Sequence, residues 1–246
     1  MAAEFRSLIT GLRVRFFPLR DVAVAAALLA LINVLAHFTV DHTSTVLVPL
    51  GAVVALGYAR WRGFTWRELG LARGQLRGGL RYAAVIVIPV VMVAIGGAML
   101  PLTRSLFLND EFSTTSAALW AALIVIPLQT VIPEEVLFRS VLNASLVRTL
   151  SVPFVYAVGA TLFGMWHISS SLGLTAGNAG LTDLLGTGFV ARLAGVIAAV
   201  SVTSAAGLLF IWLRRRSDSL LAPIALHWVL NGAGALSAAL AWQLSS

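Results

Sequence analysis

Long apolar segments follow one another along this chain and limit it to very few folds. They lie at about 22–40, 45–59, 82–100, 116–148, 152–172, 188–213 and 220–243. A membrane-spanning helix needs roughly 20 predominantly apolar residues. Only 11% of the residues are charged and the mean hydropathy is +0.93, whereas soluble domains carry about 25% charged residues. The sequence therefore predicts an all-α fold, a polytopic transmembrane helical bundle of about seven spans.

The fourth apolar segment is too long for one straight span, and it contains Pro127 and Pro133. Proline is preferred in the first turn of a helix and disrupts a helix interior. We therefore expect a broken span near Pro133, with a second helix that runs from about Pro133 to Arg148.

The N-terminal residues 4–17 mix apolar and arginine side chains. This pattern predicts a basic amphipathic helix on the membrane surface, which Pro18 ends; a disordered basic arm is the alternative. The expected organisation is an interfacial segment at residues 1–20 followed by a transmembrane domain at residues 21–246.

Arginine supplies all 17 basic residues, and its distribution indicates the orientation of the chain. One side of the expected membrane receives 14 of them: Arg6, Arg13, Arg15, Arg20, Arg60, Arg62, Arg67, Arg73, Arg77, Arg81, Arg148, Arg214, Arg215 and Arg216. The other side receives Arg104 and Arg192, and Arg139 lies within a span. Cytoplasmic loops are enriched in basic residues, so we expect a cytoplasmic N-terminus.

Arginine in loops reports topology in a membrane protein, so we expect no nucleic-acid partner despite a pI of about 11.4. The chain contains no cysteine, which excludes disulfides, thiolate metal sites and a cysteine nucleophile. The alanine-rich, lysine-free composition suggests a GC-rich genome, and we expect an integral protein of the bacterial plasma membrane.

Three charges, Glu134, Glu135 and Arg139, interrupt the fourth apolar segment. Each charge at the bilayer centre costs about 2.5–3.5 kcal/mol on insertion scales. Glu135 and Arg139 are four residues apart, so they share a helix face and should pair. Glu134 points about 100° away and has no local partner. A salt bridge that only packs helices together would leave Glu134 unexplained.

Four histidines complete the set of candidate residues. His37 and His42 flank the outer end of the first span, where we interpret them as interfacial. His167 and His227 lie inside apolar spans; Phe163 precedes the first by four residues, and Asn231 follows the second by four. We expect the adjacent Trp166 and Trp228 to serve packing.

A helical hairpin should bring Glu134 and His167 together. The two residues are equidistant from a turn centred near residue 150. We therefore expect their side chains to approach one another in one cavity.

These residues form a plausible hydrolytic set. Glu134 could act as a general base on water, with His167 polarising the water or sharing its proton. His227 and the Asn231 amide could donate hydrogen bonds to a developing oxyanion. Alternatively, Glu134, His167 and His227 could bind a divalent metal such as zinc. Spacing leaves both open, so the expected cofactor is either zinc or none.

Three ordered motifs resemble those of the CPBP family of intramembrane proteases, also called Abi, which includes CAAX prenyl endopeptidases and bacteriocin-processing or immunity proteins. They are Glu134-Glu135-x-x-x-Arg139, Phe163-x-x-x-His167 and His227-x-x-x-Asn231, within residues 133–232; the segment Trp66-Arg67-Glu68-Leu69-Gly70-Leu71 also resembles one found in bacterial members.

The resemblance implies an intramembrane endopeptidase of the glutamate or metalloprotease type that cleaves a membrane peptide or lipid-modified protein at the lipid bilayer. It implies that Glu134 and His167 activate water, that His227 and Asn231 stabilise the oxyanion, and that Glu135 and Arg139, with Phe163, support the site. Two rivals remain: a transporter that uses Glu134 and His167 as a proton relay, and a non-enzymatic immunity or binding protein.

Overall fold

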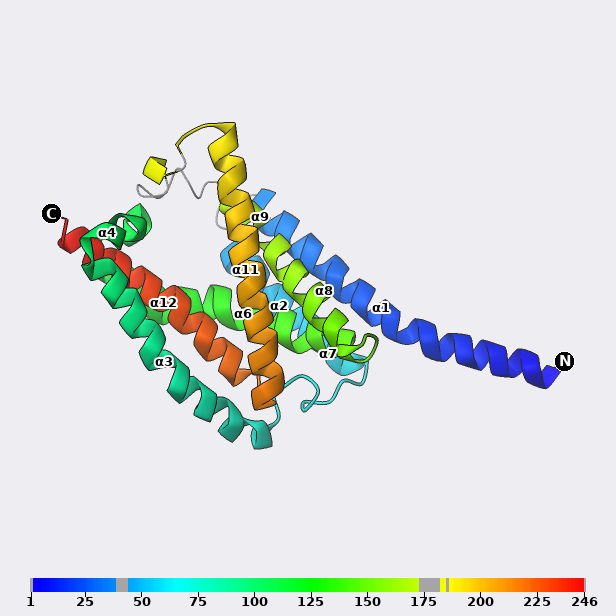
Figure 1. Ribbon diagram of the computed structural model, residues 1–246. Helices are drawn as coiled ribbons and strands as arrows, with labels where there is room; N and C mark the ends of the chain where they lie inside the picture. The colour runs from blue at the N-terminus through cyan, green and yellow to red at the C-terminus, as the bar shows by residue number, and fades with distance from the viewer. Residues whose placement is uncertain (1, 39–43, 173–181, 185, 246) are drawn as a thin grey trace.

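A computed structural model describes residues 2–38, 44–172, 182–184 and 186–245 of the chain. The helices are α1 (Ala2–Phe38), α2 (Ser44–Trp61), η1 (Arg73–Gln75), α3 (Leu76–Met99), α4 (Pro101–Arg104), η2 (Ser105–Phe107), η3 (Asp110–Phe112), α5 (Thr115–Trp120), η4 (Ala121–Val131), α6 (Ile132–Glu135), η5 (Val136–Leu142), α7 (Asn143–Val147), α8 (Val152–Trp166), α9 (Ile168–Ser171), α11 (Phe189–Ser217) and α12 (Leu221–Gln243). They form an all-α bundle (Figure 1).

Among the described residues, six helical runs are long and apolar enough to cross a membrane: Leu19–Phe38, Ser44–Trp61, Arg73–Met99, Thr115–Val147, Phe189–Ser217 and Leu221–Gln243. The seventh apolar helix, α8, is shorter. It ends at Trp166, and α9 follows after a turn at His167, so the apolar segment predicted at 152–172 is divided into two helices. Fifteen residues measure about 22 Å, less than the roughly 30 Å of a hydrocarbon core.

The prediction that Pro18 ends the first helix is wrong. The helix α1 continues through Pro18 from Ala2 to Phe38, and its first half extends beyond the bundle (Figure 1). A proline inside a helix removes one hydrogen bond without necessarily ending the helix. The expected position of residues 1–20 on the membrane surface stays a prediction.

The fourth apolar segment changes its hydrogen bonding around Pro133 but remains helical. The run from Thr115 to Val147 is continuous, and two π-helical stretches, η4 and η5, flank the short α-helix α6. The expected start of a separate helix at Pro133 is therefore wrong. Proline has no backbone N–H to donate, and a wider π-helical turn accommodates this missing hydrogen bond. In an apolar environment the other backbone groups find partners only within the helix, so the chain stays helical.

Neighbouring helices pack closely where their contact residues are small. Helix α12 lies along α3, α11 along α8 and α1 along α2 (Figure 1). At the α8–α11 contact, a Cβ atom built on Gly164 would lie 2.0 Å from the Ser204 hydroxyl oxygen and 2.8 Å from the Val200 carbonyl oxygen. Small residues allow such close helix approach in membranes, and here they fix α8 against α11.

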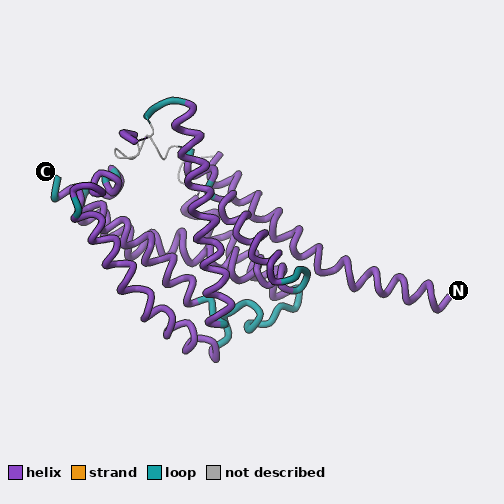
Figure 2. The backbone as a smooth tube through the Cα atoms, viewed as in Figure 1, coloured by secondary structure: helices purple, strands orange, loops and turns teal. Residues whose placement is uncertain are grey.

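Arginine-rich loops gather at one end of the bundle, which we call the arginine-rich end. The loop after α2, the turn after α7 and the segment between α11 and α12 meet there (Figure 2). Arg148 binds Glu68 at 2.6 Å, and the Leu220 amide donates to the Gly70 carbonyl at 2.9 Å. The end of α1, the start of α2 and the helix α9 lie at the opposite end (Figure 1).

Candidate active site

A polar cavity of about 310 Å³ lies between the middle of the bundle and the end remote from the arginines. Its lining comprises His37, Ser44, Thr45, Val48, Gln129, Thr130, Glu134, Trp166, His167, Ser170 and Asn231. Glu134 and His167 therefore line one cavity, as the sequence predicted.

Glu134 lines the cavity from the short helix α6, although its side chain is almost fully buried. One carboxylate oxygen, Oε1, accepts a hydrogen bond of 3.0 Å from the Trp166 indole nitrogen. The other, Oε2, has no hydrogen-bond partner among the described residues. Burial of an unsatisfied carboxylate oxygen is costly, so this oxygen is the natural place for a water or a substrate group.

His167 lies at the end of α8, where the chain turns toward α9. Its Nδ1 lies 2.8 Å from the Phe163 carbonyl oxygen. A carbonyl can only accept, so Nδ1 carries the proton and Nε2 is unprotonated in the neutral ring. Because α8 ends at Trp166, His167 lies at the level of the cavity. Its hydrogen bond to the Phe163 carbonyl fixes the orientation of the ring.

Asn231 reaches the cavity from the middle of α12, and its side chain is exposed there. His37, which we expected only at the membrane interface, also lines the cavity, and its Nδ1 lies 3.0 Å from the Asn33 carbonyl oxygen. The other expected interfacial histidine, His42, lies outside the described residues.

Glu135, Arg139 and His227 form a separate buried cluster behind the cavity. Glu135 Oε1 lies 3.2 Å from the Arg139 guanidinium, which confirms the predicted contact, and 2.9 Å from His227 Nδ1. The structure therefore does not bring His227 into the cavity beside Asn231. The two residues are four apart, about 6 Å along the helix, and one turn of α12 separates their surroundings.

Phe163 joins the cavity to this cluster. Its ring lies under the Arg139 guanidinium, 3.8 Å from the centroid, and meets His167 edge-on at 4.7 Å and His227 at 5.9 Å. A cation over an aromatic face is stabilising when both are desolvated. Phe163 therefore helps to hold a buried charge that the Glu135 ion pair alone leaves partly unsatisfied.

The described residues contain no group of three or more His, Asp or Glu side chains that could hold a metal ion. The proposed zinc set of Glu134, His167 and His227 does not gather, because His227 Nδ1 faces Glu135 rather than the cavity. The donor arrangement of this structure does not fit a zinc centre, and we derive no step through one.

Sequence reasoning assigned Trp166 to packing and did not single out Asn33. Trp166 donates to Glu134, and the Asn33 amide donates to the Trp166 carbonyl oxygen at 2.8 Å. Asn33 also accepts from Ser169 at 2.8 Å. An indole N–H in an apolar span needs a hydrogen-bond acceptor. This requirement could have identified Trp166 as a partner of a polar group in the site.

Fold and cavity together define a polytopic helical membrane protein with a buried glutamate, a histidine and an asparagine around one internal space. Residues 116–233 match the family model described as type II CAAX prenyl endopeptidase Rce1-like. This match places residues 116–233, which carry the three motifs, in the CPBP and CAAX protease family that the motifs predicted. No curated protein and no solved structure matches the chain.

Proposed function

We propose that the chain is an intramembrane endopeptidase that hydrolyses a peptide bond in the cavity of Glu134, His167 and Asn231. The observation that carries this proposal is Glu134 itself, a buried residue of the cavity lining whose second carboxylate oxygen has no partner among the described residues. The family is one of endopeptidases, and peptide hydrolysis needs a base at such a place.

Glu134 acts as the general base. Its Oε1 is fixed by Trp166, so Oε2 takes a proton from a water molecule as that water attacks the carbonyl carbon of the scissile bond. The same carboxyl group then delivers the proton to the leaving amine. His167 orients the water through Nε2, because its Nδ1 is committed to the Phe163 carbonyl.

Asn231 donates its amide N–H to the oxyanion that forms on the scissile carbonyl oxygen. An exposed amide that lines the same cavity as the base supports this role. Hydrogen-bond donors that are in position before the oxyanion forms are an effective way to lower the activation free energy of hydrolysis.

The buried cluster of His227, Glu135 and Arg139 positions the helices of the site and does not contact the substrate. The ion pair and the histidine join the helical run of Glu134 to α12, which carries Asn231. This role replaces the direct oxyanion contact that spacing suggested for His227.

The cavity supports a substrate presented at the outer face of the membrane. Its outermost lining residues, among them His37, Ser44 and Ser170, come from the helix ends remote from the arginine-rich end. By the positive-inside rule that end is cytoplasmic. We infer that the substrate is a membrane-associated peptide or protein segment, lipid-modified or not, whose scissile bond enters from the other side.

Cleavage of a membrane-peptide library by the purified full chain in nanodiscs tests this function. Glu134→Gln keeps the shape and the oxygen that accepts from Trp166 but removes the base, so we expect cleavage to fall by at least about 10²–10⁴-fold. Asp183→Asn is the matched control, because it removes an exposed carboxylate that does not line the cavity, and it should cleave as the wild type does.

The thermal unfolding midpoint of each variant reports whether the fold is intact. Full cleavage by a folded Glu134→Gln protein would overturn the assignment of the base. Absence of cleavage in the wild type across peptides with lipid-modified and unmodified ends would overturn the protease assignment.

A further inference from the structure

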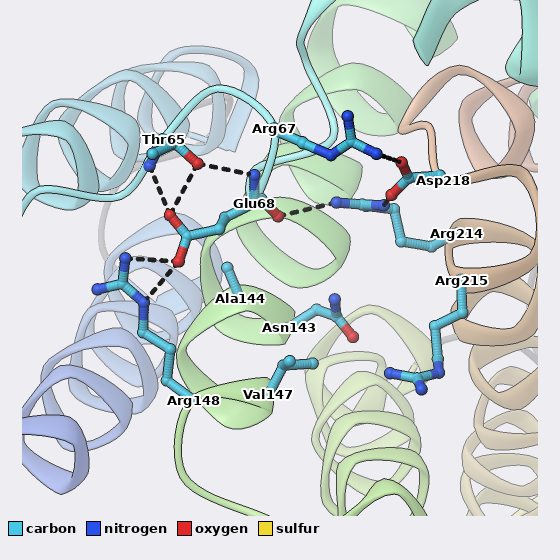
Figure 3. A pocket seen from close by; sticks show the side chains of 10 residues that line it. All are labelled: Thr65, Arg67, Glu68, Asn143, Ala144, Val147, Arg148, Arg214, Arg215 and Asp218. Atoms are coloured by element: carbon cyan, nitrogen blue, oxygen red, sulfur yellow. Dashed lines mark hydrogen bonds and ion pairs between the residues drawn. The ribbon is translucent and has the colours of Figure 1, made fainter.

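A second cavity, of about 400 Å³, lies at the arginine-rich end (Figure 3). It is lined by Thr65, Arg67, Glu68, Asn143, Ala144, Val147, Arg148, Arg214, Arg215 and Asp218. None of these residues belongs to the candidate active site, and the proposed reaction does not use the cavity.

The cavity carries more positive than negative charge. Glu68 is fully engaged, because Oε1 binds Arg148 at 2.6 Å and Oε2 accepts from the Thr65 amide at 2.7 Å. Burial would raise the pKa of Glu68, but the hydrogen bonds from Thr65 and Arg148 outweigh it and lower that pKa. Glu68 is therefore an anion that compensates Arg148.

Only one further carboxylate, Asp218, lines the cavity beside the remaining three arginines. Asp218 lies 3.3 Å from Arg67 and 3.8 Å from Arg214. Arg215 has no carboxylate partner in the described part of the chain, and its side chain extends from α11 into the space beside α7 (Figure 3). The cavity thus has an excess of two positive charges.

Two buried polar groups in the cavity wall lack partners. The Asn143 side chain is 6% exposed, and its Oδ1 accepts no hydrogen bond from any described residue. Arg214 is 5% exposed, and its Nε is likewise without an acceptor. Buried polar groups are normally satisfied, so an unsatisfied amide in a cavity with excess positive charge points to a ligand with an anionic group and a hydroxyl donor.

The depth of the cavity relative to the membrane indicates that such a ligand is a lipid headgroup. Asn143 and Val147 are in the last helical turns of the span Thr115–Val147, and Arg214 is near the end of the span Phe189–Ser217. The headgroup region of a bilayer begins where spans end. Anionic headgroups gather at the cytoplasmic surface, where arginine-rich segments bind them.

We propose that this cavity binds the headgroup of an anionic phospholipid that carries a hydroxyl, of the phosphatidylglycerol type. The phosphate lies against Arg215 and Arg214, and a headgroup hydroxyl donates to Asn143 Oδ1. This proposal does not depend on the proposed protease function.

Native mass spectrometry of the full chain in detergent, titrated with phosphatidylglycerol or phosphatidylcholine, tests the proposal. We expect the wild type to bind phosphatidylglycerol about tenfold more tightly than phosphatidylcholine. One charge-assisted hydrogen bond would give a difference of this size. Arg215→Gln and Asn143→Leu should each remove most of this preference. Arg216→Gln is the matched control, because it removes the neighbouring exposed arginine, which does not line the cavity.

Competition with free sn-glycerol 1-phosphate and with inorganic phosphate distinguishes a lipid ligand from a soluble phosphate ligand. Displacement of phosphatidylglycerol by glycerol phosphate from both the wild type and Arg216→Gln supports headgroup recognition. Equal losses in Arg215→Gln and Arg216→Gln, or no lipid preference in the wild type, would overturn the proposal. Tight binding of inorganic phosphate without any phosphatidylglycerol binding would overturn the lipid as its source.

Discussion

Glu134 and Glu135 are consecutive in the chain, yet their carboxylates meet different partners. One lines the cavity and accepts from Trp166; the other lies behind it with Arg139 and His227. Successive residues on a helix point about 100° apart, so one helical turn supplies both the proposed base and the ion pair behind it.

Local spacing predicted only part of this arrangement. The Glu135–Arg139 contact follows from four-residue spacing on one helix. The Glu135–His227 contact joins residues 92 positions apart, and it depends on the rotation of α12 against η5, which spacing does not determine. The role of Trp166 was missed for the same reason, because its acceptor lies on another helix.

Trp166 positions Glu134, so Trp166→Phe should slow the reaction more than it weakens substrate binding. The ring packing against Phe138, at 5.5 Å, is kept, whereas the hydrogen bond to Oε1 is lost. Hydrogen bonds to charged groups contribute about 1.5–3 kcal/mol, and we expect kcat to fall about ten- to hundredfold with little change in KM.

Trp212→Phe is the control for this substitution, because Trp212 packs edge-on to Tyr82 away from the cavity. Steady-state kinetics on one cleaved peptide separate kcat from KM. A change in KM alone for Trp166→Phe would contradict the positioning role.

At the scale of elements, helices persist through prolines that the sequence suggested would end them. The prolines Pro18 and Pro133 both lie inside continuous helical runs. In an apolar environment a helix satisfies the backbone groups that an interruption would expose. Apolar segment length therefore predicted most spans, whereas the helix end at Trp166 depended on tertiary structure.

The close approach of α8 to α11 should be sensitive to a single methyl group. Gly164→Ala would place Cβ within 2.8 Å of the Val200 backbone oxygen, and backbone atoms yield little. Overpacking of this kind costs about 1–3 kcal/mol, so we expect a lower thermal unfolding midpoint.

The matched control is Gly57→Ala in α2, where a Cβ atom meets nothing within 4 Å. An added methyl group there should be neutral or stabilise the protein by up to about 1 kcal/mol. Equal effects of the two substitutions would contradict close packing of α8 on α11.

At the scale of the whole molecule, the two cavities lie toward opposite ends of the bundle. The arginine-rich end carries the proposed headgroup site, and the candidate active site opens toward the other end. The distribution of arginines predicted which loops share an end, and the ion pair between Arg148 and Glu68 joins two of them. The position of the cavity required the structure, because His167 lines it from the point where α8 ends.

Because the chain has no cysteine, single introduced cysteines report the side of the membrane directly. In intact cells, a membrane-impermeant maleimide should label Ser170→Cys at the cavity and leave Arg216→Cys unlabelled. Arg216→Cys should react only after the cells are permeabilised. The reverse pattern would contradict the proposed orientation.

The most direct test of the central claim is peptide cleavage by Ser170→Cys before and after this labelling. Ser170 lines the cavity, so a bulky adduct there should block access to Glu134 and His167. We expect cleavage to disappear in proportion to labelling at Ser170→Cys and to persist in fully labelled Arg216→Cys. Full activity of completely labelled Ser170→Cys would show that hydrolysis takes place elsewhere.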